Sequence, residues 1–207
     1  MLEFPKSTEM SKQLPKKAIY AKFQMNTAAK DKIDADISKI TIVNEITPDK
    51  VNIPAGENVQ NFFVLLVTLK RRNFDEKNIA VLSKLIPQNI LFILEYEGSC
   101  ELAIYHTKLM QTQWRPADQY SIELKGIDLD KVWENIVAQI GGITIVDNNT
   151  LDEQIQLDES RQKLEKEIAK LEKLARSEKQ PRKKFELVQQ LRKLEFELRR
   201  MASGKNN

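Results

Sequence analysis

The sequence has few of the residues that build disulfide, redox or metal centres. Its 207 residues include one cysteine, Cys100, and one histidine, His106. A single cysteine cannot form an internal disulfide or a cysteine-based zinc cluster, and a single histidine excludes a site with several histidine ligands. The longest apolar run, Phe62 to Val67, is far too short to cross a bilayer, and Met1 to Lys6 holds no apolar signal segment. We therefore expect a cytoplasmic protein with no membrane partner.

Glycine is also scarce, with six residues in the chain. The only glycine pair, Gly141-Gly142, follows an amphipathic stretch and so ends a predicted helix, whereas a phosphate-binding turn opens one. The sequence contains no Walker A loop, dinucleotide-binding turn, nucleophile elbow or zincin helix. From these absences we expect no cofactor and no metal site, and we predict that the chain is not an enzyme.

The single residues with reactive or aromatic side chains favour structural roles. His106 follows a predicted strand and has no visible partner to make it a general base, so the pattern favours a structural or surface histidine. Cys100 precedes Glu101, whose negative charge disfavours a thiolate, and we interpret it as unreactive. Trp114 lies in a predicted loop, where stacking on a base and folding back onto the core are both open. Trp133 lies on an apolar helical stripe and is predicted to be core.

The first 60 residues give a mixed pattern in which short segments alternate with proline and glycine. Apolar residues alternate from Ile19 to Met25, as in a half-buried strand, and Pro15 stops the segment before it. In chain order we predict a short helix over 7–14, a strand over 19–25, a helix that begins at Asn26 or Thr27, a strand from Ile40, and a loop or hairpin around Val51 and Ile53.

The middle of the chain gives stronger signals. Phe62 to Leu69 is apolar on both faces, which predicts a central strand covered on each side. Asp75 is predicted to begin a helix that Pro87 ends. The remaining predictions are strands over 90–96 and 101–107 joined by a turn at Gly98-Ser99, an edge strand over 121–124, and a helix capped by Asp128 or Asp130. This order predicts an α+β domain over residues 1–149, with a mixed sheet and flanking helices.

Residues 150–207 differ in composition and form a second predicted domain. Apolar residues recur there at steps of seven, four and three, on both sides of Pro181. Two such seams joined by a short polar break predict an antiparallel helical hairpin, and Pro181 suits the first turn of its second helix. One continuous helix in an intermolecular coiled coil is the competing geometry. The predicted seam residues are Leu157, Leu164, Ile168, Leu171 and Ala175, then Leu187, Leu191, Leu194, Leu198 and Met201.

Positive charge is confined to the end of the chain. The formal net charge is +3, yet residues 177–207 alone hold 9 basic and 4 acidic residues, a balance of +5. Such a cluster suits a phosphate backbone, an acidic protein surface or simply a solvated helix face. The candidate nucleic-acid or partner-binding residues are Lys179, Arg182, Lys183 and Lys184 at the predicted bend, with Arg192, Lys193, Arg199 and Arg200 beyond it.

One enzymatic alternative remains open at this stage. The predicted order of elements over residues 27–96 loosely follows the core of restriction endonucleases, in which an Asp and a Glu-x-Lys bind a metal ion that activates water. The corresponding segment here is Thr68-Leu69-Lys70, in which Thr68 cannot supply the carboxylate. Asp49 is then the sole acidic candidate, and one hard ligand is too little for Mg²⁺. The likeness, which is one of element order only, indicates a degenerate nuclease at most.

Several longer segments resemble a bacterial family catalogued only as a domain of unknown function. They are residues 5–8 and 12–17, Leu82 to Asn89, Tyr105 to Leu109, and Thr150 to Gln154, and the resemblance extends over nearly the whole chain. It implies that the gene lies beside helicases and DNA methyltransferases similar to type III restriction systems, within antiviral defence islands. It supplies no catalytic residues.

These observations lead to one favoured hypothesis and two alternatives. We expect a non-catalytic accessory subunit of a bacterial DNA-modification or phage-defence complex, with a helicase or DNA methyltransferase as partner and DNA as a further ligand. The alternatives are the divergent nuclease and a homo-oligomeric scaffold held together by the C-terminal helices.

Overall fold

The computed structural model describes residues 2, 4–145 and 149–202 of the chain. The chain divides into two compact units, residues 1–143 and 144–207, which we call the sheet unit and the hairpin unit. The predicted fold class is confirmed: a mixed sheet with flanking helices is followed by a long helix pair. No helix among the described residues combines the length and apolarity that a membrane span needs.

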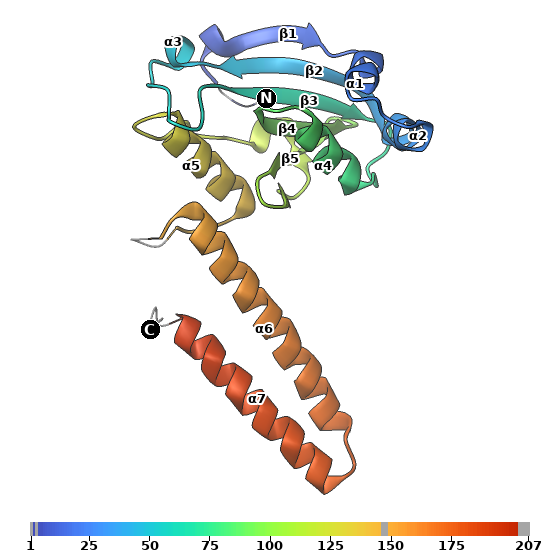
Figure 1. Cartoon of the computed structure of the whole chain (residues 1–207), viewed down its shortest axis with the longest axis vertical. Helices are drawn as coiled ribbons and strands as arrows, with labels where there is room; N and C mark the ends of the chain where they lie inside the picture. Colours follow the sequence, from blue (N-terminus) through green and yellow to red (C-terminus); the bar gives the residue numbers. More distant parts are fainter. Residues whose placement is uncertain (1, 3, 146–148, 203–207) are drawn as a thin grey trace. The chain divides into compact units, whose positions relative to one another are not determined.

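One sheet of seven strands organises the described part of the sheet unit. Its spatial order is β1-β2-β3-β4-β5-β6, with β7 paired to β5; Figure 1 labels the first five of these strands. The β3–β4 pair is parallel and every other pair is antiparallel. The strands are β1 (Glu9–Gln13), β2 (Ile37–Ile46), β3 (Phe62–Leu69), β4 (Asn89–Tyr96), β5 (Ser99–Tyr105), β6 (Leu109–Gln111) and β7 (Arg115–Pro116).

Helices cover the sheet because a parallel pair needs a crossover and both of its faces are apolar. The crossover between β3 and β4 is α4 (Glu76–Leu85). Two further helices, α1 (Lys16–Lys22) and α2 (Thr27–Asp36), lie at one end of β1–β3 in Figure 1 and share a core with α4. The helix α5 (Leu129–Gly141) packs on β5 and β6, and its Trp133 ring centroid lies 5.2 Å from that of Phe62 on β3. The remaining short helices are the 3₁₀ turns η1 (Lys6–Thr8) and η2 (Ala117–Gln119), and α3 (Pro48–Val51).

Most of the strong sequence signals are confirmed. β3 covers 62–69 as predicted and lies between β2 and β4 at the centre of the sheet. The side chains of Asn26, Asp75 and Asp128 each accept a backbone N–H at the start of a helix. The β4–β5 hairpin turns at Glu97 and Gly98, both with positive φ, which is the geometry of a tight two-residue hairpin loop.

Three predictions in the sheet unit are wrong. Residues 7–14 form η1 and β1 instead of a helix, because the segment pairs with β2. Residues 19–25 are mostly α1 instead of a strand, since so short a segment cannot separate a period of two from a period of 3.6. Residues 121–124 form no strand; the amide of Gln139 on α5 bonds both the N–H and the carbonyl of Glu123, so these groups need no strand partner.

A single carboxylate ties α5 to the loop before β3. Asp130 accepts backbone N–H groups from three successive residues: Glu57 at 2.9 Å, Asn58 at 3.1 Å and Val59 at 2.6 Å. Gly56 precedes them because a side chain there would collide with Asp130. Although burial acts against it, this set of hydrogen bonds lowers the pKa of Asp130 and keeps it charged. The loop is therefore fixed by a side chain far away in the sequence.

Candidate binding surfaces

The hairpin unit consists of two antiparallel helices, α6 (Leu151–Ser177) and α7 (Pro181–Ala202), which pack on each other (Figure 1). A capping box at Thr150 and Glu153 begins α6. Pro181 is the first residue of α7, as predicted, where its missing N–H costs nothing. The five predicted seam residues of α7 are half-buried, so the hairpin geometry is confirmed over the competing continuous helix.

All eight candidate cations lie on this hairpin with exposed side chains. Lys179, Arg182, Lys183 and Lys184 gather where α6 turns into α7; Arg192, Lys193, Arg199 and Arg200 follow along α7. The structure thus brings the first four together, whereas the other four extend along one helix.

The first turn of α7 places positive charge where a helix disfavours it. It contains no acidic residue, yet Arg182, Lys183 and Lys184 follow Pro181 directly. A helix N-terminus carries a partial positive charge, so each cation there costs about 0.3–1 kcal/mol at low salt. Glu186 offers Arg182 only a long contact of 3.5 Å in a solvent-exposed pair. This concentration of charge does little for folding and suits an anionic ligand.

Two exposed aromatic residues of α7 were missed by the sequence analysis. Phe185 and Phe196 are each 63% exposed, outside the seam that α7 shares with α6. Their signal in the sequence was their failure to fit the spacing of the seam leucines.

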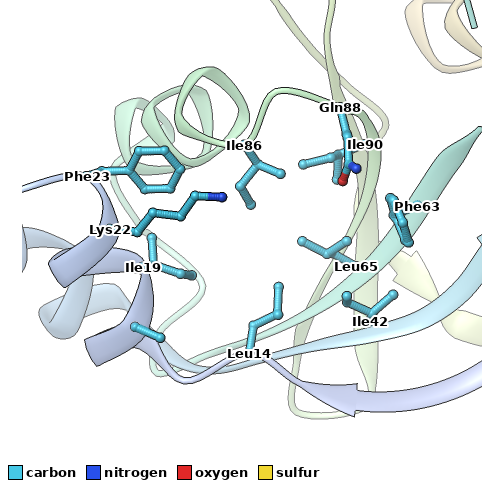
Figure 2. A pocket seen from close by; sticks show the side chains of 11 residues that line it. Leu14, Ile19, Lys22, Phe23, Ile42, Phe63, Leu65, Ile86, Gln88 and Ile90 are labelled. Atoms are coloured by element: carbon cyan, nitrogen blue, oxygen red, sulfur yellow. The ribbon is translucent and has the colours of Figure 1, made fainter.

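The sheet unit contains an apolar cavity of about 230 Å³ (Figure 2). It lies over β2, β3 and β4, between α1 and the residues that follow α4. Lys22 and Gln88 are its only polar lining residues, and Figure 2 shows the Lys22 side chain extending toward Ile86. The other lining residues are Leu14, Ala18, Ile19, Phe23, Ile42, Phe63, Leu65, Ile86 and Ile90.

The cavity can accept a small apolar group and performs no evident chemistry. Its lining has no carboxylate, hydroxyl or thiol, so it offers neither a nucleophile nor an acid–base pair. Its volume is below the range of pockets that hold drug-sized ligands. One or two apolar side chains of another protein would fill it. The sequence could not reveal the cavity, because segments as short as α1 and β1 do not determine their own secondary structure.

A buried carboxylate organises the other end of the same face. Asp36, 1% exposed, accepts hydrogen bonds from Arg71 at 2.6 Å, from the backbone N–H of Asp75 at 2.8 Å and from Asn78 at 2.7 Å. Burial alone would raise the pKa of Asp36, but these donors outweigh it and hold the pKa below its ordinary value. Every partner lies in α4 or the loop before it, so Asp36 anchors that segment to the end of α2.

Glu101 is the second buried carboxylate, 6% exposed on β5. It accepts a hydrogen bond of 3.0 Å from Gln111. Burial raises the pKa of Glu101 to about 7, with Glu76 adding to the shift and Gln111 and Arg72 opposing it. The guanidinium of Arg72 lies 5.2 Å from the ring centroid of Trp114, which packs against the core. Of the two roles open for Trp114, the structure shows the packed one.

The other single residues have the following positions. Trp133 is core, 5% exposed. Cys100 is buried, and burial raises the pKa of its thiol, in agreement with an unreactive role. His106 is half-buried in the turn between β5 and β6, where its backbone N–H donates a hydrogen bond to the carbonyl of Lys108.

The two residues of the nuclease alternative lie at opposite ends of the sheet. Asp49 is in α3, next to the start of β3, whereas Lys70 follows the end of β3. The eight residues of β3 separate them by roughly 25 Å. Lys70 instead donates a 2.5 Å hydrogen bond to the carbonyl of Asp34. Within the described residues no group of three or more His, Cys, Asp or Glu side chains is placed to hold a metal ion.

Comparison with known protein families gives a match over nearly the whole chain. Residues 2–198 match a family model described as "Domain of unknown function (DUF4391)". No curated protein and no solved structure matches the chain.

Proposed function

Because the chain belongs to the DUF4391 family, whose description assigns no activity, we propose a function from the chain's own surfaces. It is a cytoplasmic, non-catalytic accessory subunit of a bacterial DNA-modification or antiphage defence system. The hairpin unit contacts nucleic acid, and the sheet unit binds a helicase or DNA methyltransferase. The observation that carries this proposal is the cluster Lys179, Arg182, Lys183 and Lys184, exposed at the bend of the hairpin.

Electrostatics favours a polyanion as the ligand of the bend. The four cations surround the positive end of α7, so their fields add to that of the helix dipole. The seam residues of α7 face α6 and leave the charged side chains in solvent. Such a cluster binds a phosphate backbone independently of base sequence, because binding releases condensed counterions.

The sheet unit supports the partner half of the proposal. Its apolar cavity is too small for a nucleotide-sized cofactor but matches the size of a partner's anchoring side chain. Lys22 lines this cavity and the exposed Lys17 is on the same helix, so the positive charge of α1 favours an acidic partner surface. The resemblance that links the family to helicases and methyltransferases names the class of partner.

The DNA half of the proposal is tested by charge reversal. We expect the full chain to bind a short DNA duplex at about 50 mM salt in a fluorescence anisotropy titration. With four phosphate contacts, affinity should fall about 100-fold between 50 and 200 mM salt. Reversing all four bend cations to Glu should abolish binding. The matched control reverses four exposed basic residues of α6 (Arg161, Lys163, Lys166 and Lys170) and should retain most of it, because these residues lie two turns or more of helix before the bend.

The partner half is tested by co-purification with a helicase or methyltransferase of the kind that the resemblance implies beside the gene. Lys22→Glu and Ala18→Trp, which reverse the rim charge and fill the cavity, should weaken capture. If the chain binds neither DNA at low salt nor these enzymes, the accessory function is refuted.

A further inference from the structure

The two exposed phenylalanines of α7 lie outside the seam that joins α7 to α6. The apolar seam of α7 faces α6, whereas Phe185 and Phe196 remain 63% exposed. A phenylalanine left mostly in water forgoes most of the free energy that burial of its ring would contribute. Their position and exposure leave both rings open to contact with an external ligand.

Phe185 and Phe196 lie on one face of α7. They are 11 residues apart, which in an α-helix is three turns and about 20° of rotation, over about 16 Å of axis. Arg192 and Arg199, at seven and 14 residues from Phe185, lie within about 40° of the same line. Helical geometry thus produces a stripe in the order Phe185, Gln189, Arg192, Phe196, Arg199, which we call the Phe–Arg stripe.

The stripe carries no acidic side chain. The three glutamates of α7 are Glu186, Glu195 and Glu197, and each is rotated by roughly 80–120° from the line through Phe185. Lys193 and Arg200 flank the stripe with exposed side chains. The rings therefore lie among basic side chains, which extend the positive charge of the bend along α7.

We propose that the Phe–Arg stripe binds single-stranded nucleic acid, with bases stacked on the two rings and phosphates held by the arginines. This inference rests on the proposed nucleic-acid contact of the hairpin and names its class. Exposed rings separated by cations are the arrangement that single-strand binding proteins use, because every base has a stacking face. In a duplex the bases already stack on each other, so the rings would gain nothing from it.

A protein helix fits this surface less well. Helix-in-groove partners are held by apolar anchors at spacings of three, four and seven residues. Here the two apolar residues are 11 apart, and the positions between them on the stripe are Gln189 and Arg192. The spacing fits separate stacking platforms along an extended strand better than one continuous apolar interface.

The test compares a fluorescein-labelled oligothymidylate of about 20 nucleotides with a duplex of equal length, using the full chain. We expect the single strand to bind at least 10-fold more tightly than the duplex. Phe185→Leu and Phe196→Leu, which keep an apolar side chain but lose the ring, should each weaken single-strand binding about 10-fold and leave duplex binding within 2-fold. Phe→Tyr at either position should retain binding. Leu174→Ala removes a 45% exposed apolar residue of α6 and serves as the control.

The outcomes separate this inference from the proposed function. Equal affinity for both oligonucleotides, unchanged by the leucine variants but lost on reversal of the bend cations, would overturn the stripe and leave the accessory function intact. Binding of neither oligonucleotide at about 50 mM salt would refute the nucleic-acid contact and the stripe together. Self-association that light scattering detects and the leucine variants abolish, without any effect on oligonucleotide binding, would assign the stripe to a protein interface and overturn the inference. Far-UV circular dichroism verifies that each variant keeps its helices.

Discussion

Glu101 should make the stability of the sheet unit depend on pH near neutrality. The residue is 6% exposed, and its carboxylate accepts a hydrogen bond from Gln111. Burial raises the pKa of Glu101 from 4.5 to about 7. The informative perturbation is Glu101→Gln, since glutamine keeps the shape and can still accept the bond from Gln111, but cannot ionise.

The sign follows from proton binding. The folded state holds the proton of Glu101 more tightly than the unfolded state, so the free energy of unfolding falls as pH rises from about 4.5 to about 7. With these two pKa values, the wild-type chain loses about 2.5 kcal/mol between pH 5 and pH 8 through this group alone. The glutamine variant lacks that loss, so its advantage over the wild type should grow with pH and level off above pH 7.

Urea unfolding at several pH values between about 5 and 8 measures the effect. Both tryptophans of the chain, Trp114 and Trp133, belong to the sheet unit, so their fluorescence reports on it. Glu9→Gln, which removes an exposed carboxylate from β1, is the matched control. A difference between wild type and Glu101→Gln that stays constant within about 0.5 kcal/mol over this range would refute the reasoning.

Three further predictions concern the packing of the sheet unit. Asp36→Asn replaces a buried carboxylate that accepts hydrogen bonds from several donors, so urea unfolding should show a loss of about 3 kcal/mol in the free energy of unfolding. The control, Asp31→Asn at an exposed position of the same helix, should cost less than about 0.5 kcal/mol. Equal effects would contradict the anchoring role of Asp36. Because the pKa of Asp36 is lowered on folding, this stability is present above about pH 4 and is lost as pH falls further; acid titration of both chains should therefore bring their stabilities together. Gly56→Ala would place a Cβ 2.7 Å from the backbone nitrogen of Asp130. Because this contact is too close, thermal melting should show a loss of about 2 kcal/mol in the free energy of unfolding. An unchanged melting temperature would mean that the loop can move aside. Phe62→Ala should cost about 3–5 kcal/mol in the same assay, since the ring is fully buried against Trp133 at the start of the central strand. A cost below about 1 kcal/mol would argue against a close-packed core there.

Long or capped segments were predictable from the sequence. The central strand, the helices begun by Asp75 and Asp128, and the two helices around Pro181 all carry their own signals: an apolar run, an apolar period or a capping residue. The positions of the eight hairpin cations followed from this, because a heptad seam assigns the remaining positions to solvent.

Short segments at the N-terminus were not predictable. Residues 7–13 and 16–22 are too short for their periodicity to separate helix from strand, and pairing with β2 and packing on the sheet decided between them. The cavity was missed for the same reason, since α1 forms one of its walls.

By itself the sequence determined the mixed sheet, the helical hairpin and the confinement of positive charge to the hairpin, because these depend on composition and on contacts between residues close along the chain. Only the tertiary structure decided which carboxylates are buried and that a cavity lies beside α1. Each of these depends on what a distant segment places next to a side chain, and that neighbour sets its burial, its hydrogen bonds and its pKa.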